Sequence, residues 1–163
     1  MAGGIRDGHA LKAVIPGGSS VPVLPGELMM EANMDYDSIQ KAGSMLGSGA
    51  VVIMDETTCM VRMLQRISRF YYSESCGQCT PCREGTGWMY RVITRIIEGK
   101  GSQDDMDKLV DVANKIEGRT ICALGDAAAW PVQSFVKHYR HEFEYMVENK
   151  GRSIVDSPEY KAA

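Results

Sequence analysis

Three cysteines spaced two residues apart constrain this chain more than any other feature of its sequence. Cys76, Cys79 and Cys82 share one short segment, and a fourth cysteine, Cys122, follows far along the chain. A compact C-x2-C-x2-C run with one remote cysteine is the pattern by which a chain holds a [4Fe–4S] cluster through four thiolates. Three sulfurs from one loop would bind one face of the cube, and the distant fourth would complete the site.

Two other chemistries are open to the same four thiols. Structural Zn²⁺ is also bound by four cysteines, but these usually come as two C-x2-C pairs, so the three-plus-one grouping favours the cluster. A thiol–disulfide relay would use Cys76 and Cys79, yet no βαβ pattern surrounds them and Cys82 would have no role. Five cysteines cannot all pair with one another. The fifth, Cys59, opens an apolar helical pattern and is expected to be a buried, inert thiol.

Composition excludes several classes of protein. The net charge is −3, and no window is rich in Lys and Arg, so we expect no nucleic-acid partner. No apolar run approaches the roughly 20 residues that cross a bilayer. The first residues lack the apolar core of a signal peptide. The sequence therefore predicts a soluble, cytosolic chain of one ordinary domain or two small ones.

The first part of the chain, to about residue 55, combines short apolar runs with Gly, Pro and Ser. Residues 11–15 and 50–54 have the pattern of strands, with a turn signal at 16–20. The prolines that follow, Pro22 and Pro25, confine the next segment to an edge strand or a loop. Residues 35–42 fit one short helix capped by Asp35. These elements predict a small α+β module.

From Thr57 onward apolar residues recur at helical spacing. Thr57 or Thr58 is the expected N-cap of the first helix. The second helix follows the cysteine loop, with Thr80 as N-cap and Pro81 at its first position, and Gly99 ends it. Its apolar face is expected to contain Trp88, Met89, Val92, Ile93, Ile96 and Ile97.

Two further helices complete the pattern. Ser102 and Asp105 resemble a capping box at the start of the third helix, and Gly118 stops it. The last helix carries apolar residues from 132 to 147, and Pro131 is expected in its first turn or at its beginning, because proline lacks an N–H. Four helices with short connections predict a four-helix bundle.

Both cysteine segments are expected at helix ends. Cys82 falls in the first turn of the second helix, where free N–H groups and the helix dipole favour negative charge. Four thiolates around an iron–sulfur core carry such a charge. Arg83 and Arg119 flank ligand positions, and each would either donate hydrogen bonds to cluster sulfurs or form an ordinary salt bridge.

The sequence contains no Ser–His–Asp set, no paired-carboxylate signature and no HExxH motif. The glycine-rich segment 43–49 precedes a strand and lacks a following Lys-Ser/Thr, so it meets neither the P-loop nor the dinucleotide fingerprint. His9, His138 and His141 are scattered and are expected in packing or solvent. The chemistry that the sequence indicates is one-electron transfer.

The two cysteine segments, 74–85 and 116–126, resemble the cluster-binding segments of the NADH-oxidising flavoprotein subunit of respiratory complex I. The similarity continues through 127–131, and residues 11–20 resemble the soluble-ligand-binding β-grasp module of the same family. Almost the whole chain is covered. The resemblance implies that Cys76, Cys79, Cys82 and Cys122 are the ligands of one [4Fe–4S] cluster.

The sequence departs from this family in one large feature. The FMN- and NADH-binding domain of the family would lie N-terminal to this chain and is absent from it. The resemblance implies that FMN, reduced by NADH, passes single electrons to the cluster, which relays them towards quinone. The chain is expected to bind neither FMN nor NADH alone. Related subunits of NAD-linked hydrogenases and formate dehydrogenases are an alternative, as is a structural zinc-binding module.

The resemblance also implies neighbours and a location. The partners would be a thioredoxin-like [2Fe–2S] subunit and a large iron–sulfur subunit, on the cytoplasmic side of a bacterial inner membrane or the mitochondrial matrix side, with no direct membrane insertion. The expected fold is α+β. A β-grasp-like module over residues 1–55 precedes a helical-bundle cluster domain over 56–150, and residues 151–163 form a flexible tail.

Overall fold

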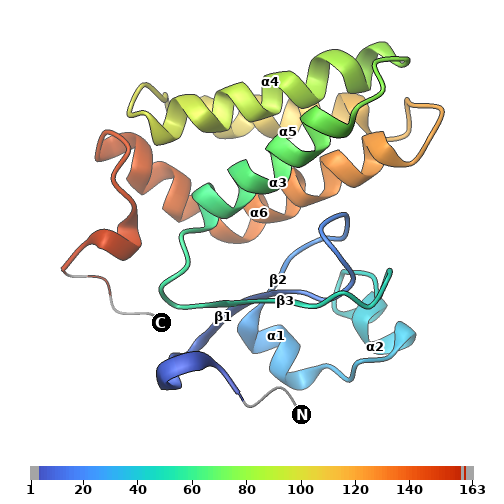
Figure 1. The fold of residues 1–163 in the computed structure, drawn as a ribbon. Helices are drawn as coiled ribbons and strands as arrows, with labels where there is room; N and C mark the ends of the chain where they lie inside the picture. Colours follow the sequence, from blue (N-terminus) through green and yellow to red (C-terminus); the bar gives the residue numbers. More distant parts are fainter. Residues whose placement is uncertain (1–3, 159, 161–163) are drawn as a thin grey trace.

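The computed structural model describes residues 4–158 and 160. Four long helices pack together, and a small sheet with two short helices lies beside them (Figure 1). This mixture of helices with a small antiparallel sheet confirms the predicted class. In chain order the elements are η1 (Arg6–Gly8), β1 (Leu11–Ile15), β2 (Leu24–Pro25), α1 (Gly26–Glu31), α2 (Tyr36–Lys41), β3 (Val52–Asp55), α3 (Met60–Glu74), α4 (Thr80–Ile97), α5 (Asp105–Ile116), α6 (Leu124–Glu148) and η2 (Ile154–Asp156).

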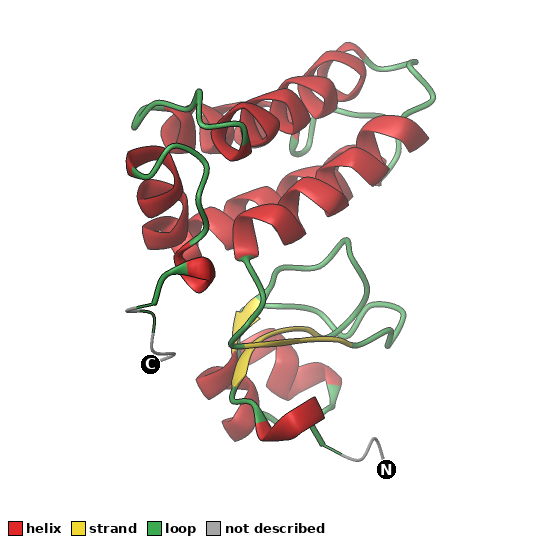
Figure 2. Cartoon of the chain, turned by 60° about the vertical axis from the view of Figure 1, so that its left-hand side comes forward, coloured by secondary structure: helices red, strands yellow, loops and turns green. Residues whose placement is uncertain are grey.

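The sheet is antiparallel, in the order β2-β1-β3. The predicted strand 11–15 is confirmed as the central strand, and the strand predicted at 50–54 is β3, which begins two residues later. β2 contains Pro25 and lies at the sheet edge, as expected for a residue that cannot donate to a ladder. Turned by 60°, the sheet remains on one side of the helical layer (Figure 2).

The two short helices differ in how well the sequence predicts them. α2 is confirmed: the Asp35 carboxylate accepts a hydrogen bond from the Ser38 N–H at 2.7 Å, as an N-cap should. The sequence does not predict α1. This helix begins directly after Pro25 without a side-chain cap and presents Met30 to solvent, so it carries neither a capping signal nor a clear apolar face.

The predicted N-cap of α3 is wrong. Thr57 and Thr58 do not cap it, because their hydroxyl groups donate instead to the Asp55 carboxylate, at 2.7 and 3.2 Å. The N-cap position is Cys59, with no cap from its own side chain. The free N–H of Met60 is bound by a residue distant in sequence, Glu142 of α6, at 3.0 Å. A local signal could not reveal this long-range cap.

The ends of α4 and α5 follow the predicted signals closely. Gly99 and Gly118 both adopt positive φ just beyond a helix C-terminus, as αL caps do. At the start of α5 the Asp105 carboxylate accepts from the Ser102 N–H and hydroxyl, both at 3.0 Å, which forms one half of the expected box. The other half is not formed, because the N-cap is Asp104 and no side chain caps the helix. Burial by itself raises the pKa of Asp105, but hydrogen bonds from Ser102 and Arg95 outweigh it and hold the pKa below its usual value.

Pro131 does not start the last helix, contrary to the prediction. α6 begins at Leu124, and Pro131 lies inside it. A proline at this depth removes one helical hydrogen bond. The neighbouring residues Ala128, Ala129 and Val132 are almost completely buried, so packing compensates for the missing bond. The side chain of Ser134 donates to the Pro131 carbonyl at 3.1 Å.

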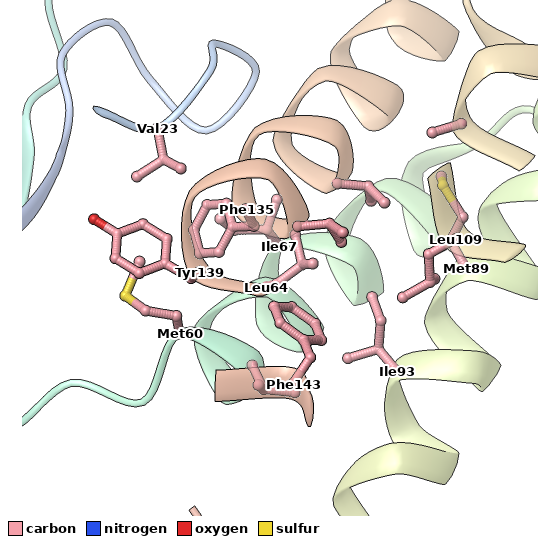
Figure 3. Packing of buried hydrophobic residues seen from close by; sticks show 14 of the residues in the cluster. Val23, Met60, Leu64, Ile67, Met89, Ile93, Leu109, Phe135, Tyr139 and Phe143 are labelled. Atoms are coloured by element: carbon pink, nitrogen blue, oxygen red, sulfur yellow. The ribbon is translucent and has the colours of Figure 1, made fainter. Parts of the chain in front are cut away.

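One apolar core runs through the helices and reaches the sheet (Figure 3). Leu64, Phe135 and Phe143 are fully buried where α3 and α6 meet, and Val23 extends the cluster to the segment before β2. The prediction that Trp88 shares the buried face of α4 is wrong, because its side chain is 55% exposed. The face is confirmed for Met89, Ile93 and Ile96.

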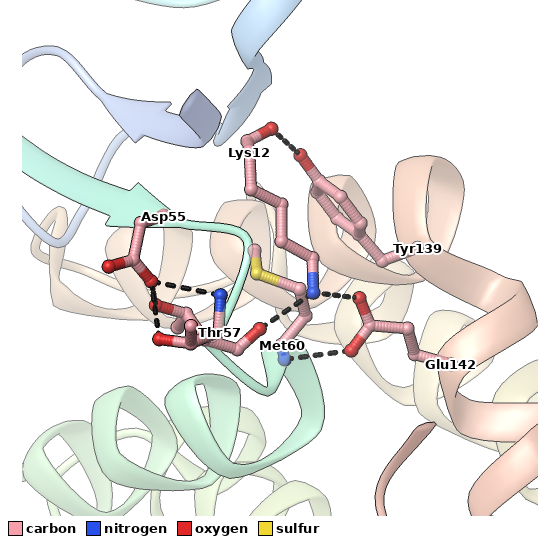
Figure 4. A network of polar contacts seen from close by, with 7 residues as sticks. Lys12, Asp55, Thr57, Met60, Tyr139 and Glu142 are labelled. Atoms are coloured by element: carbon pink, nitrogen blue, oxygen red, sulfur yellow. Dashed lines mark hydrogen bonds and ion pairs between the residues drawn. The ribbon is translucent and has the colours of Figure 1, made fainter. Parts of the chain in front are cut away.

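A buried polar network joins the sheet to the helices (Figure 4). Lys12 Nζ of β1 lies 2.6 Å from Glu142 Oε1, a contact held by charge without the angle of a hydrogen bond. Lys12 also donates to the Thr58 carbonyl at 2.7 Å. The Tyr139 hydroxyl donates to the Lys12 carbonyl at 3.0 Å, and burial raises the pKa of Tyr139. Glu142 therefore neutralises Lys12 and caps α3 at the same time.

The chain after α6 turns back onto the helices. Val155 packs against the apolar core, and Arg62 of α3 pairs with Asp156 at 3.2 Å. The predicted tail, 151–163, lies partly outside the described residues. In the described ranges, 4–158 and 160, no helix is both long enough and apolar enough to cross a membrane.

Replacing Glu142 with Ala is expected to destabilise the fold by about 3–5 kcal/mol, because it leaves the Lys12 ammonium buried without its partner and the Met60 N–H without an acceptor. Urea denaturation measures the loss. Glu144→Ala, which breaks a half-exposed pair with Arg140, is the control and should cost about 1 kcal/mol or less. Equal losses in the two variants would contradict the role of Glu142.

Candidate metal centre

The three clustered cysteines lie between the end of α3 and the first turn of α4. Cys76 is exposed in the connecting loop. Cys79 is the N-cap of α4, one residue before the predicted cap at Thr80. Cys82 lies in the first turn of α4, as predicted, and is only 7% exposed. Two of the thiols therefore lie at the positive end of the α4 dipole, where negatively charged ligands are favoured.

The loop that carries Cys76 is held by Arg83. Gly77 adopts φ +81°, a conformation that favours glycine, and its carbonyl accepts from Arg83 Nη1 at 2.9 Å. Arg83 also pairs with Glu84. Arg119 donates to the Asn114 carbonyl at 2.6 Å. The two predicted roles are donation to a cluster sulfur or an ordinary salt bridge. Arg83 forms a salt bridge, with Glu84, whereas Arg119 binds a backbone carbonyl, which is neither of the two.

The fourth cysteine lies in the connection between α5 and α6. Gly85 lets α5 approach α4 closely, since a Cβ there would come within 2.6 Å of Ile116. The connection itself is braced by two hydrogen bonds: Asp126 accepts from the Gly118 N–H at 2.7 Å, and Thr120 donates to the Cys122 carbonyl at 2.8 Å. These contacts hold the segment that carries Cys122.

Glu117 anchors the same connection to α6. Its carboxylate accepts from Gln133 at 2.8 Å and from the Trp130 indole at 2.7 Å. The hydrogen bonds from Gln133 and then Trp130 lower the pKa of Glu117. The stretch from 127 to 131, which follows the second cysteine segment in sequence, thus helps fix that segment in space.

Two hydrogen bonds to sulfur tie the cysteine segments together. The Ile121 N–H, directly before Cys122, donates to Cys79 Sγ at 3.4 Å. The Ser75 hydroxyl lies 3.2 Å from Cys82 Sγ and is the donor whenever that sulfur is a thiolate. The sequence predicts neither the Ser75 nor the Ile121 donor. The one signal in the sequence is the hydroxyl residue Ser75 itself, at the expected end of the first helix and directly before Cys76.

The structure brings the two cysteine segments together but does not gather the four sulfurs into one coordination shell. Within residues 4–158 and 160, no three His, Cys, Asp or Glu side chains are close enough to hold a metal ion. All five cysteines are free thiols, and Cys59 is buried as predicted. The donor set still fits an iron–sulfur cluster in its chemistry, because it offers four unpaired thiols from two segments in direct contact.

Thiols presented at helix ends by a helical scaffold are typical of an iron–sulfur electron carrier. Comparison with known proteins defines the class. Residues 62–146 match the family described as the NADH-ubiquinone oxidoreductase-F iron-sulfur binding region. This chain belongs to that family, whose cofactor is a 4Fe–4S cluster.

Similar proteins from several bacteria support the same family assignment. The chain is 55% identical over 148 residues to a subunit of the NADH-quinone oxidoreductase of Rickettsia bellii, covering 90% of this chain and 36% of the relative. The corresponding NADH-quinone oxidoreductase subunit of Rhizobium meliloti is 54% identical over 152 residues, covering 93% of this chain and 35% of the relative. The chain thus spans about a third of the length of these relatives.

Solved structures show the same fold in a second type of complex. Two crystal structures of an NAD+-reducing [NiFe]-hydrogenase, in the H2-reduced and air-oxidized states, superimpose with a TM-score of 0.76 at 25% identity. The match covers 85% of this chain and 24% of the hydrogenase chain.

If Cys122 is a ligand, Cys122→Ala should lose most of the bound iron and acid-labile sulfide, because three thiolates leave one corner of the cube without a protein ligand. Iron and sulfide analysis after anaerobic reconstitution measures this. Cys59→Ala removes the buried thiol outside the two segments and should keep full cluster content. A Cys122→Ala protein with unchanged iron and sulfide would refute the assignment.

Proposed function

We propose that this chain relays single electrons through one [4Fe–4S] cluster held by Cys76, Cys79, Cys82 and Cys122. The observation that carries the proposal is the contact between the two cysteine segments, inside the region that matches the iron–sulfur family. A [4Fe–4S] cluster, when bound, supplies one-electron oxidation and reduction. The family match favours iron–sulfur over structural zinc at these thiols.

The residues around the thiols prepare the site for negative charge. The start of α4, with its N–H groups and the positive end of the helix dipole, would favour an anionic cluster beside Cys79 and Cys82. The Ser75 hydroxyl and the Ile121 N–H donate to two of the four sulfurs. Cys82 is shielded from water, whereas Cys76 and Cys122 are exposed. One side of the site is insulated, and the other is accessible to a partner.

The whole assembly extends beyond this chain. The relatives are named as subunits of NADH-quinone oxidoreductase, and the chain matches a C-terminal part of them. We propose that FMN and NADH bind the remaining part, and that this chain passes electrons from reduced FMN towards quinone. A thioredoxin-like [2Fe–2S] subunit and a large iron–sulfur subunit would be its neighbours, on the cytoplasmic or matrix side of the membrane.

The finer architecture belongs to the same proposal. Residues 1–55 would form a β-grasp-like docking module, and residues 56–150 would form a four-helix bundle that holds the cluster. The extensive packing among α3, α4, α5 and α6 supports the bundle. A diaphorase subunit of an NAD-linked hydrogenase is the second candidate, favoured by the structural match. The identities of 54–55% favour the quinone oxidoreductase.

Anaerobic reconstitution with iron and sulfide tests the proposal. We expect a brown protein whose absorption is bleached by dithionite and whose reduced form gives the electron paramagnetic resonance signal of one [4Fe–4S] cluster. Addition of NADH or FMN to the chain alone should give no binding at micromolar concentration. A colourless protein that retains zinc would refute the proposal.

Ser75→Ala is expected to lower the reduction potential of the cluster, because hydrogen bonds to cluster sulfurs favour the more negative reduced state. Potentiometric titration followed by paramagnetic resonance measures the midpoint. Ser75→Thr keeps a hydroxyl and should stay near the wild-type value. The same potential in Ser75→Ala and wild type would show that this hydroxyl does not act on the cluster.

A further inference from the structure

A groove of about 620 Å³ lies between α4 and α5, on the surface of the helical layer. It is separate from the thiols and from the polar network. Its walls come from one face of each helix: Trp88, Arg91, Val92 and Arg95 of α4, and Lys108, Asp111 and Val112 of α5. The four α4 residues follow helical spacing, so they form one continuous stripe.

The groove is positively charged although the chain as a whole carries a net charge of −3. Arg95 and Lys108 both face the buried Asp105, which neutralises one of the two charges. Arg91 makes no hydrogen bond or ion pair with any other described residue. Asp111, which also lines the groove, is already paired with Lys115 at 2.6 Å. A net positive charge therefore remains along the stripe.

An apolar surface accompanies this charge. Trp88 is 55% exposed, the only one of the predicted apolar residues of α4 to be so open. Val92 and Val112 lie beside it in the groove and are half-buried. Trp and Arg are enriched among the residues that contribute most of the binding energy at protein–protein interfaces. Here they lie side by side, flanked by aliphatic groups.

We propose that this groove binds an acidic segment of another polypeptide, with a carboxylate on Arg91 and an apolar side chain against Trp88. An acidic occupant is chosen because the groove is positively charged. From Trp88 to Arg95 the stripe is about 10 Å long, by the rise of a helix, so two turns of a helix or a few extended residues would cover it. The proposal concerns docking and stands independently of the cluster.

A nucleic acid fits this groove less well. Phosphate binding needs cations that are free of carboxylates, yet Asp111 lines the groove and Asp105 is paired with its Lys108. Among the described residues that line the groove, only Arg91 is an unpaired cation. One free cation beside a tryptophan and two valines suits a mixed acidic and apolar peptide.

Photo-crosslinking in the assembled complex tests the proposal. Trp88 of the full-length subunit is replaced by photoreactive p-benzoylphenylalanine, which keeps an aromatic group, and the crosslinked peptide is identified by mass spectrometry. We expect one segment rich in Asp and Glu that also contains an apolar residue. Adding Arg91→Glu should reduce the crosslink yield about tenfold, because like charges then face each other.

Arg66→Glu is the matched control, since Arg66 belongs to α3 and does not line the groove, and it should leave the yield unchanged. Iron content and circular dichroism establish that each variant is folded. Crosslinks to nucleic acid, to a second copy of this chain or to a neutral or basic segment would overturn the proposal. So would an absence of crosslinks, or equal yields in the Arg91→Glu and Arg66→Glu proteins.

Discussion

The carboxylate of Glu142 is the constraint on which the rest of the structure depends. It neutralises Lys12 of the central strand and binds the free N–H at the start of α3. One side chain of α6 thereby fixes the sheet and α3 together. Because α3 extends about 22 Å from that point, its far end is held as well, and the far end leads directly into the cysteine loop. A buried charge at one end of the helices thus sets the position of the thiols at the other.

The site itself is assembled from helix ends rather than from a continuous surface. α3 ends beside Ser75, α4 begins at Cys79, and the connection from α5 to α6 carries Cys122. Helix ends suit this purpose because their unpaired N–H groups already favour anionic ligands. Gly85 allows the close approach of α4 and α5, and the connection after α5 contacts the other cysteine segment through the Ile121 N–H. A small residue at a helix contact therefore helps to bring the two cysteine segments together without itself supplying a sulfur.

The sequence predicts most of what is local. The central strand, the cap of α2 by Asp35 and the glycine ends of α4 and α5 follow from short-range physics that a few residues contain. What it misses is long-range: the cap of α3 comes from Glu142, far along the chain, and Pro131 is tolerated because α6 is buried around it. The candidate ligands rest on spacing and family resemblance, and they remain a prediction.

The four thiols are not equivalent, and this asymmetry bears on how a relay would work. Cys82 is buried and lies within hydrogen-bond distance of the Ser75 hydroxyl, whereas Cys76 and Cys122 are exposed. Burial disfavours a charged group, so a thiolate at Cys82 would depend most on the helix dipole and a hydroxyl donor. Electrons would therefore leave or enter through the side of Cys76 and Cys122, where a partner can approach without displacing the core.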